Sequence, residues 1–423
     1  MTSDLTAYPM RPNTLEYCFY TKLTMTDGKF PPSEEGPGTP KNIRDASPEI
    51  EVEASPSIQK ASMSSTLRRL MGDSGHPAWP KWATLRRPGA DAAAAGLPLE
   101  FNIKIQAGVM DYTKASSKEG TAEEVFADAA NSIAAIRKAT SEMAPASLGE
   151  LQEELVDQMI RVVFGSNLVE RAGLGLDETV TLCRTVFAGN WSDDLESPAR
   201  PTEYHDGLEK LVQDAGELEG PRQTSLRDRR EVINHAGALM YMISHVIDNN
   251  EPFSEGLIRN THKILVRGVD VLHSDGKVTP SEQYAGFYRT VHVAAGDCNF
   301  VNPTFVPKNM KSFVEDLNRR LHAAEEQEEL DPFYIAAHAC SEFVNIHPFL
   351  DGNGRTCRLI LNTILLKYAG ILAPIGESEY QRTEYLDIAR RRGEEECGSG
   401  ELALYTLGKA SAALRKLREK LHA

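Results

Sequence analysis

A turn between two apolar helical segments, HPFLDGNGRTCR at residues 347–358, constrains this chain more than any other feature. Pro348 disfavours helical geometry at the residue before it, so the first helix must end there and leave His347 on a loop. The Gly-Asn-Gly run at 352–354 tolerates left-handed backbone conformations, and a second apolar helical pattern starts beside it. Such a turn exposes backbone N–H groups at a helix N-terminus, which is an arrangement that binds anions.

Side chains suited to phosphate chemistry surround this turn. Arg355 and Arg358 lie three residues apart on the second helix, so both guanidinium groups can reach an anion at its start. Asp351 offers the oxygen ligand that Mg²⁺ prefers, and His347 can accept a proton near neutral pH. A single Asp-Gly-Asn-Gly run is ordinary turn chemistry, but the whole set predicts a phosphate-binding catalytic site.

From about Ala122 onward, apolar residues recur at the spacing of amphipathic helices. One strand pair is expected around Val291–Val293 and Phe300–Phe305, on either side of a turn-forming Gly-Asp pair. The predicted fold is an all-α helical bundle with one β-hairpin. The expected helices are Val125–Met143, Leu148–Phe164, Asp177–Phe187, Arg229–Asp248, Ser254–Val266, Met310–His322, Pro332–Ile346, Arg355–Tyr368, Thr383–Arg391 and Leu402–Leu421.

The first 100 residues differ in composition from the rest, because they hold 12 of the 23 prolines and a tetra-alanine run. Such a segment cannot bury enough apolar surface to offset the loss of chain entropy, so we expect residues 1–100 to be disordered. The domains expected after this leader are a helical region over 101–250, a catalytic domain over 251–407 and the end of a C-terminal helix over 408–423.

Charge and hydropathy argue against several classes of partner. The chain has 46 Lys and Arg against 61 Asp and Glu, a formal net charge of −15, which disfavours wrapping nucleic acid or an anionic membrane. The longest apolar run, 236–247, is about half of the ~20 residues that a membrane span needs. No secretory signal is evident, and the six cysteines form no C-x-x-C pair. We therefore expect no nucleic-acid or membrane partner and a cytoplasmic or nuclear location.

The segment at 347–358 resembles the Fic family motif, H-x-F-x-(D/E)-G-N-G-R-x-x-R, at every fixed position. The resemblance extends from about Ser254 to Leu407 and includes the Gly-Phe-Tyr-Arg step at 286–289 and the hairpin. It implies a Fic-type helical bundle that uses ATP and Mg²⁺ to transfer AMP to a Ser, Thr or Tyr hydroxyl of a target protein. By motif position, His347 would be the base, Asp351 the Mg²⁺ ligand and Phe349 a core residue that fixes the loop. The residues implied to hold the ATP phosphates are Gly352, Asn353, Gly354, Arg355 and Arg358.

The same resemblance implies an inhibitory helix around 160–171. Ser166 and Glu170 match the family pattern (S/T)-x-x-x-E-(G/N), although Arg171 stands where Gly or Asn is usual. Glu170 is expected to pair with Arg358 and withdraw it from the γ-phosphate. A cation at position 171 is expected to compete for the Glu170 carboxylate and so to loosen the brake.

The hairpin, over residues 291–305, resembles the family's flap, which pairs with an extended target segment by strand addition. Tyr385, on a helix after the motif, is the residue that the resemblance suggests for the adenine pocket, although no Asn follows it.

Two other functions stay open, a hydrolase that uses Glu170 to remove AMP and a catalytically quiet ATP-binding signalling module. A homodimer is also left open. The histidines expected to be packing or surface residues are His235, His245, His262 and His338.

Overall fold

The structure is a computed structural model. It describes residues 102–103, 105, 112, 120–141, 148–189, 226–273, 276–295, 298–327, 329–391 and 399–422. The predicted disorder of residues 1–100 lies outside the described residues.

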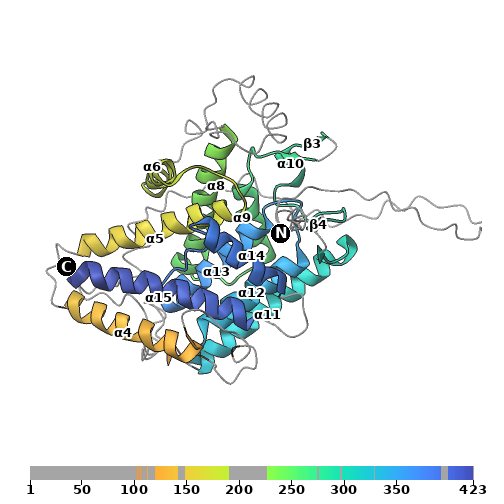
Figure 1. Ribbon diagram of the computed structural model, residues 1–423. Helices are drawn as coiled ribbons and strands as arrows, with labels where there is room; N and C mark the ends of the chain where they lie inside the picture. The colour runs from red at the N-terminus through yellow and green to blue at the C-terminus, as the bar shows by residue number, and fades with distance from the viewer. Residues whose placement is uncertain are drawn as a thin grey trace, which may run out of the picture.

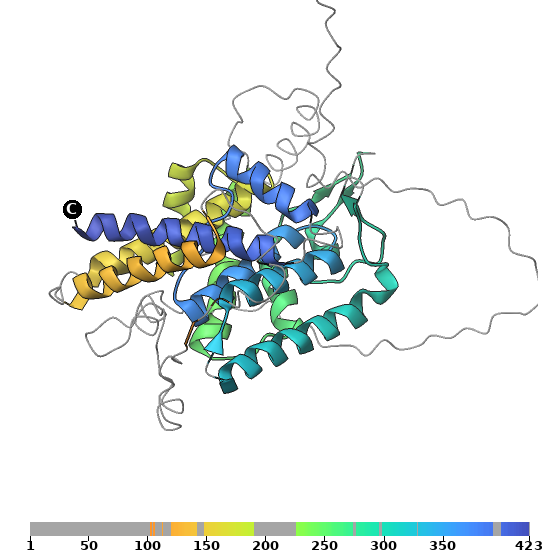
Figure 2. The ribbon, with the colours of Figure 1, turned by 60° about the horizontal axis from the view of Figure 1, so that its bottom comes forward.

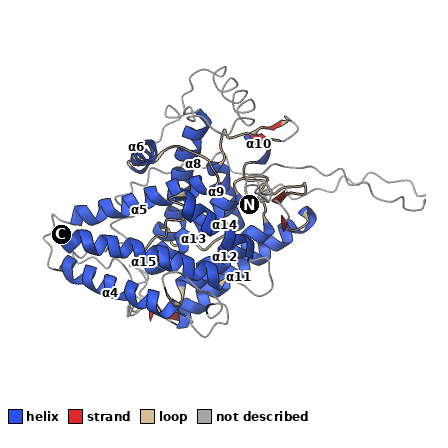
Figure 3. Cartoon of the chain, viewed as in Figure 1, coloured by secondary structure: helices blue, strands red, loops and turns tan. Residues whose placement is uncertain are grey.

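Helices account for most of the described chain, as Figure 3 shows, and the predicted all-α fold is confirmed. A π-helical turn (Ser244–Asp248) extends α8, and none of the helices in the described ranges is long and apolar enough to cross a bilayer. The helices are α4 (Ala122–Ser141), α5 (Leu148–Val169), α6 (Leu176–Phe187), α8 (Leu226–Ile243), α9 (Glu255–Leu265), α10 (Ser281–Tyr284), α11 (Val306–Gln327), α12 (Pro332–Ile346), α13 (Asn353–Ala369), α14 (Glu379–Arg391) and α15 (Gly400–His422).

Helix α13 forms the centre of the bundle, and 15 of its 17 residues are buried. It packs against α12, α8, α9 and α5, so it is buried on all of its faces rather than along one stripe. Helices α4, α5 and α15 lie side by side and extend away from this centre (Figures 1 and 2). The N-terminus of α13, where the phosphate site is predicted, is therefore enclosed by other helices.

The ends of α12 and α13 follow from the local sequence. Asp331 caps α12, because its side chain accepts a hydrogen bond from the Tyr334 amide and a proline follows it. Helix α12 ends at His347, which has a left-handed backbone with φ of 49°. Gly352, also left-handed, begins α13, and left-handed Gly370 ends it. The motif is thus a tight turn between two buried helices.

The predicted hairpin is present but shorter than expected. Strands β4 (Ala294–Ala295) and β5 (Cys298–Asn299) pair antiparallel, whereas the strands were expected around 291–293 and 300–305. The carbonyl groups of Val291 and Val301 accept hydrogen bonds from a buried guanidinium instead of from backbone N–H groups of a facing strand. Residues Pro303–Phe305 form a 3₁₀ turn that leads into α11.

Two further strand pairs were not predicted from the sequence. Strands β2 (Val271–Leu272) and β3 (Val278–Thr279) pair antiparallel, and β1 (Asn102–Ile103) pairs parallel with β6 (Glu329–Leu330). Each strand has two residues, which is too short for an alternating pattern to be visible. The β1–β6 pair also joins segments more than 220 residues apart, and local sequence carries no signal for such pairing.

Candidate functional site

The turn at 348–352 is held by the side chain of Asn353. The Phe349 amide donates to Asn353 Oδ1, and Asn353 Nδ2 donates to the Phe349 carbonyl, both at 2.9 Å. Phe349 itself is completely buried. A single asparagine therefore fixes both polar groups of the Phe349 backbone and closes the turn over the start of α13.

His262, on α9, also holds this turn in place. Its Nδ1 accepts a hydrogen bond from the Gly286 amide at 2.9 Å, so Nε2 carries the proton and donates to the Asp351 carbonyl at 2.8 Å. The imidazole stacks on the Phe349 ring at a centroid distance of 3.7 Å. Burial lowers the pKa of His262 to about 4, so the ring stays neutral. The sequence predicted a packing residue here, and the structure adds that it fixes the backbone of Asp351.

His347 lies at the opposite end of the turn, partly exposed, with its ring stacked on Phe300 of the flap at 3.7 Å. Its Nδ1 is 3.3 Å from the Val344 carbonyl, which can only accept, so Nδ1 carries the proton and Nε2 has a free lone pair. Desolvation lowers the pKa of His347 to about 3, and the positive charge of Arg289 contributes. The imidazole is neutral at physiological pH and can accept a proton at Nε2.

Arg355 is buried, with 3% of its side chain exposed, between two acidic residues. Its Nη2 is 3.3 Å from Asp351 Oδ2, and its Nη1 is 3.6 Å from Glu231 Oε1 on α8. Desolvation opposes ionisation of Asp351, but Arg355 and the Gly352 amide outweigh it and lower the pKa of Asp351. Nε and Nη1 of Arg355 have no hydrogen-bond partner among the described residues.

Arg358 is held by the end of α5. Its Nε donates to Ser166 Oγ at 2.8 Å, and its Nη2 donates to the Ser166 carbonyl at 2.9 Å and to Glu170 Oε1 at 2.6 Å. Burial disfavours the charged guanidinium, but the Glu170 carboxylate outweighs this effect and raises the pKa of Arg358. The structure thus brings Ser166 and Glu170, at the end of α5, together with Arg358, which lies more than 180 residues later.

Glu170 also lies directly over the first turn of α13, because a Cβ atom built on Gly354 would overlap Glu170 Oε1. We expect Gly354→Ala to destabilise the protein by about 1–3 kcal/mol, because displacing the end of the Glu170 side chain breaks its 2.6 Å hydrogen bond with the buried Arg358, and to weaken ATP binding. Thermal unfolding and nucleotide titration measure the two effects. Gly256→Ala is the matched control, because its helix position has no heavy atom nearer than 3.8 Å. Equal melting temperatures of the two variants would contradict the expected overlap.

Arg171 takes a left-handed conformation, with φ of 51°, directly after Glu170. Glycine and asparagine adopt this conformation at low cost, which explains why they suit the position. The guanidinium of Arg171 reaches α14, where its Nη2 is 3.8 Å from Glu379 Oε2. Arg171 therefore has an acidic partner on another helix, and its expected competition for Glu170 stays a prediction.

Tyr385 lies on α14 and is 3% exposed. Its ring packs against the Arg358 guanidinium, with Cζ 5.5 Å from the ring centroid. The structure thus places Tyr385 beside the phosphate-site arginine, and its role in adenine binding stays a prediction.

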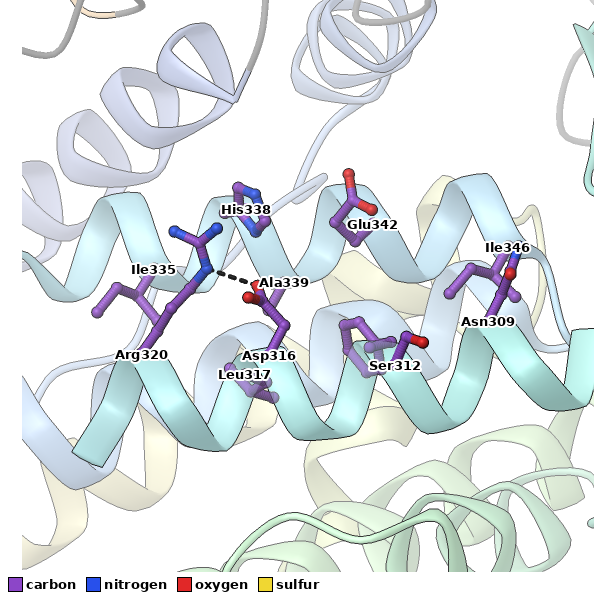
Figure 4. A pocket seen from close by; sticks show the side chains of 11 residues that line it. Asn309, Ser312, Asp316, Leu317, Arg320, Ile335, His338, Ala339, Glu342 and Ile346 are labelled. Carbon is purple, nitrogen blue, oxygen red and sulfur yellow. Dashed lines mark hydrogen bonds and ion pairs between the residues drawn. The ribbon is translucent and has the colours of Figure 1, made fainter. Parts of the chain in front are cut away.

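A groove of about 350 Å³ runs between α11 and α12 (Figure 4). Its wall on α11 carries an ion pair between Asp316 and Arg320, with an Nε–Oδ2 distance of 2.6 Å. At one end the groove reaches Ile346, the residue before His347. The groove thus adjoins the catalytic loop but contains none of the motif residues.

Three residues of the site carried no assigned role at the level of sequence. Glu231, Phe300 and Arg289 contact Arg355, His347 and the catalytic loop, respectively. Arg289 belongs to the Gly-Phe-Tyr-Arg step, which was a usable signal. Glu231 is an ordinary helix residue more than 100 positions before the motif, and Phe300 is one of several aromatic residues near the hairpin, so nothing in the local pattern distinguishes either.

Comparison with known proteins gives the following relationships. A model of the Fic/DOC family matches residues 252–365. A Fido domain-containing protein of Dictyostelium discoideum is 30% identical over 137 residues, which cover 32% of this chain and 93% of that protein. The protein adenylyltransferase fic-1 of Caenorhabditis elegans is 30% identical over 155 residues, 36% of this chain and 27% of that relative. This chain therefore matches about a quarter of the adenylyltransferase's length. A solved structure of a C. elegans Fic-1 fragment superposes with a TM-score of 0.46 and 18% identity, over 70% of this chain and 72% of that one.

Proposed function

This chain belongs to the Fic/DOC family, and on that premise we propose that it is a protein adenylyltransferase, which transfers AMP from ATP to a Ser, Thr or Tyr hydroxyl of a target protein. One observation carries the proposal. A neutral histidine with a free Nε2 stands beside a buried helix N-terminus that bears two arginines. The catalytic domain would span 251–407, after a helical region over 101–250.

The unpaired donors of the site fit a triphosphate. Nε and Nη1 of Arg355 and Nη1 of Arg358 are buried without a hydrogen-bond partner in the described chain. Leaving such a group unsatisfied costs about 1–3 kcal/mol, and phosphate oxygens would satisfy all three. Gly352, Asn353 and Gly354 add the N–H groups and the positive end of the α13 dipole. A polyanion therefore suits the site better than a neutral ligand.

Asp351 would hold Mg²⁺. Its side chain is 22% exposed, and its lowered pKa keeps it ionised at neutral pH. In the described part of the chain no group of three or more His, Cys, Asp or Glu residues could hold a metal ion. A single carboxylate completed by phosphate oxygens and water is the usual environment of Mg²⁺ bound with a nucleotide. The ion would neutralise phosphate charge when bound.

The residues present can support an in-line displacement. The target hydroxyl oxygen would bond to the α-phosphorus as the bond to the β-phosphate bridge breaks, and its proton would pass to His347 Nε2. Arg355 and Arg358 would stabilise the charge on the departing pyrophosphate. The flap at 291–305 would present the target segment by strand addition, because within the described residues β4 and β5 pair only with each other and each keeps an outer edge.

We also propose that Glu170 restrains this reaction. Arg358 cannot give Nη2 to the γ-phosphate while that nitrogen is bonded to Ser166 and Glu170. Nη1 of Arg358 stays available, so ATP could still bind. The brake would therefore change the position of the γ-phosphate rather than prevent ATP binding.

The position of a radioactive label tests the proposed reaction. We expect the Glu170→Gly protein, incubated with Mg²⁺ and ATP, to retain label from the α-phosphate and none from the γ-phosphate. Retention of γ-label would indicate phosphoryl transfer and contradict the proposal. Nucleotide binding with no label from either position would favour the signalling module. Loss of AMP from a pre-modified protein, abolished by Glu170→Gly, would favour the hydrolase.

A further inference from the structure

We propose that Arg289 is a positioning residue that couples the flap to the catalytic loop, so that docking of a target on the flap and placement of His347 are one event. The inference rests on the proposed function, because it assigns a role within the same reaction. It goes beyond the motif, since Arg289 lies 58 residues before His347.

Arg289 binds the catalytic loop through consecutive backbone carbonyls at the end of α12. Its Nε donates to the His347 carbonyl at 2.6 Å, and its Nη2 is 3.3 Å from the Ile346 carbonyl. Its own amide donates to the Pro348 carbonyl at 2.8 Å. The last carbonyls of a helix lack intrahelical partners and favour a cation. Arg289 therefore fixes the backbone from which the His347 side chain projects.

The same guanidinium binds both arms of the flap. Nη1 donates to the Val291 carbonyl at 2.8 Å, and Nη2 donates to the Val301 carbonyl. These carbonyls lie on opposite sides of the β4–β5 pair. Arg289 thus closes the base of the flap where strand pairing has ended.

A second contact links the flap to the catalytic residue. Phe300, next to Val301, stacks on the His347 imidazole at a centroid distance of 3.7 Å. His347 is therefore held from two directions, through its backbone by Arg289 and through its ring by the flap. A displacement of the Val301 arm would move both contacts.

The chemistry of this contact set requires arginine. Arg289 is 5% exposed, and the acceptors of its guanidinium within the described residues are backbone carbonyls, whose dipoles stabilise the positive charge. Burial lowers its pKa to about 10, which leaves it charged at neutral pH. A guanidinium presents five donors in a rigid planar fork, whereas a lysine ammonium has three on one atom and cannot span three segments. The contacts to three segments thus explain why a cation is buried at this position, where a residue that only filled space would be apolar.

The test compares Arg289→Lys with Arg259→Lys. Arg259 is the matched control, because its Nε donates to a nearby backbone carbonyl, that of Gly286, at 2.7 Å, without touching the catalytic loop. We expect Arg289→Lys to lower the rate of self-labelling from α-labelled ATP at least about tenfold, with the dissociation constant of a non-hydrolysable ATP analogue unchanged. Hydrogen exchange should accelerate at residues 291–301 and 346–350 together and stay unchanged in α13.

A rate loss no larger than that of Arg259→Lys, or a matching loss of nucleotide affinity, would overturn the coupling. The labelling rates are compared in the Glu170→Gly background, where the proposed brake is absent; if that protein transfers no label, the proposed reaction fails, and the exchange experiment still decides the coupling. If the Arg289→Lys protein does not fold, hydrogen exchange of the wild-type protein is measured instead, at a series of denaturant concentrations below the unfolding transition. Segments 291–301 and 346–350 should then open with one common free energy, and two separate values would refute the proposal.

Discussion

The His347→Ala protein is expected to transfer AMP about 10²–10⁴-fold more slowly than the protein with histidine, which is the usual contribution of a general base. The imidazole is well prepared for this role, because its Nδ1–H faces the Val344 carbonyl and leaves Nε2 with a lone pair. Nucleotide affinity should not change, since the phosphate-binding donors lie on α13 and not on the histidine. Initial rates with α-labelled ATP and titration with an ATP analogue measure the two quantities separately.

The pH profile gives this prediction a second readout. Desolvation and Arg289 lower the pKa of His347 to about 3, so the base is unprotonated throughout the range from pH 6 to 8. We therefore expect no inflection near pH 6.5, the ordinary pKa of histidine, in the rate of transfer. His245→Ala is the control for loss of a histidine, because His245 lies in the π-helical turn and pairs with Glu251 at 2.7 Å rather than with the residues of the site. If the His347→Ala protein transfers AMP at more than one tenth of the parent rate, His347 is not the general base.

The catalytic turn could be predicted from sequence because its interactions are local. Pro348 and the Gly-Asn-Gly run determine the backbone over a few residues, and the Asn353–Phe349 hydrogen bonds span four positions. Helices were predicted for the same reason, since apolar spacing over 10–20 residues reports which face is buried. The all-α fold class followed from those patterns, while the enclosure of α13 on every side became visible only in three dimensions.

The supports of the turn could not be predicted, because they come from distant segments. His262 contacts the Asp351 backbone across 89 residues, and Arg289 contacts the His347 backbone across 58. His262 is an ordinary residue in its own helix, so no local pattern separates it from a surface residue. The Gly-Phe-Tyr-Arg step at 286–289 did mark Arg289, but it did not show which segments Arg289 contacts. The hairpin boundaries shifted for a related reason. The carbonyls of Val291 and Val301 accept hydrogen bonds from the Arg289 guanidinium, so they are not available to strand N–H groups and the strand pair ends before them.

Two glutamates help to reconcile the acidic chain with its cationic site. Glu170 pairs with Arg358 at 2.6 Å, and Glu231 lies 3.6 Å from Arg355. Both arginines are almost completely buried, and a buried cation without a counter-ion would cost several kcal/mol. Each arginine therefore has a carboxylate partner inside the chain. The two glutamates differ in attachment, because Glu231 lies within α8 and Glu170 follows the last residue of α5. Glu170 is thus the partner that can be withdrawn with least disturbance of the core.

Replacing Glu170 by glycine is expected to raise transfer to the chain itself and to target proteins several-fold. The substitution removes the 2.6 Å ion pair but keeps both contacts between Arg358 and Ser166. The guanidinium therefore stays in place, and one of the two hydrogens on Nη2 becomes available to a γ-phosphate. It also clears the space over Gly354 that Glu170 now fills. Transfer rate and ATP affinity, measured side by side, separate productive binding from tighter binding.

Glu153→Gly provides the control, because Glu153 lies on α5, the helix that Glu170 directly follows, and pairs with Arg184 at 2.6 Å, away from the site. Glycine disfavours helix formation by about 1 kcal/mol, so a gain seen in both variants would reflect a loosened α5 rather than a released Arg358. An unchanged rate in Glu170→Gly would exclude the brake. A gain in retained label can also arise from lost AMP removal, and a chase with unlabelled ATP distinguishes the causes. Faster initial labelling indicates a released transferase, whereas equal initial rates with slower loss indicate that Glu170 serves the reverse reaction.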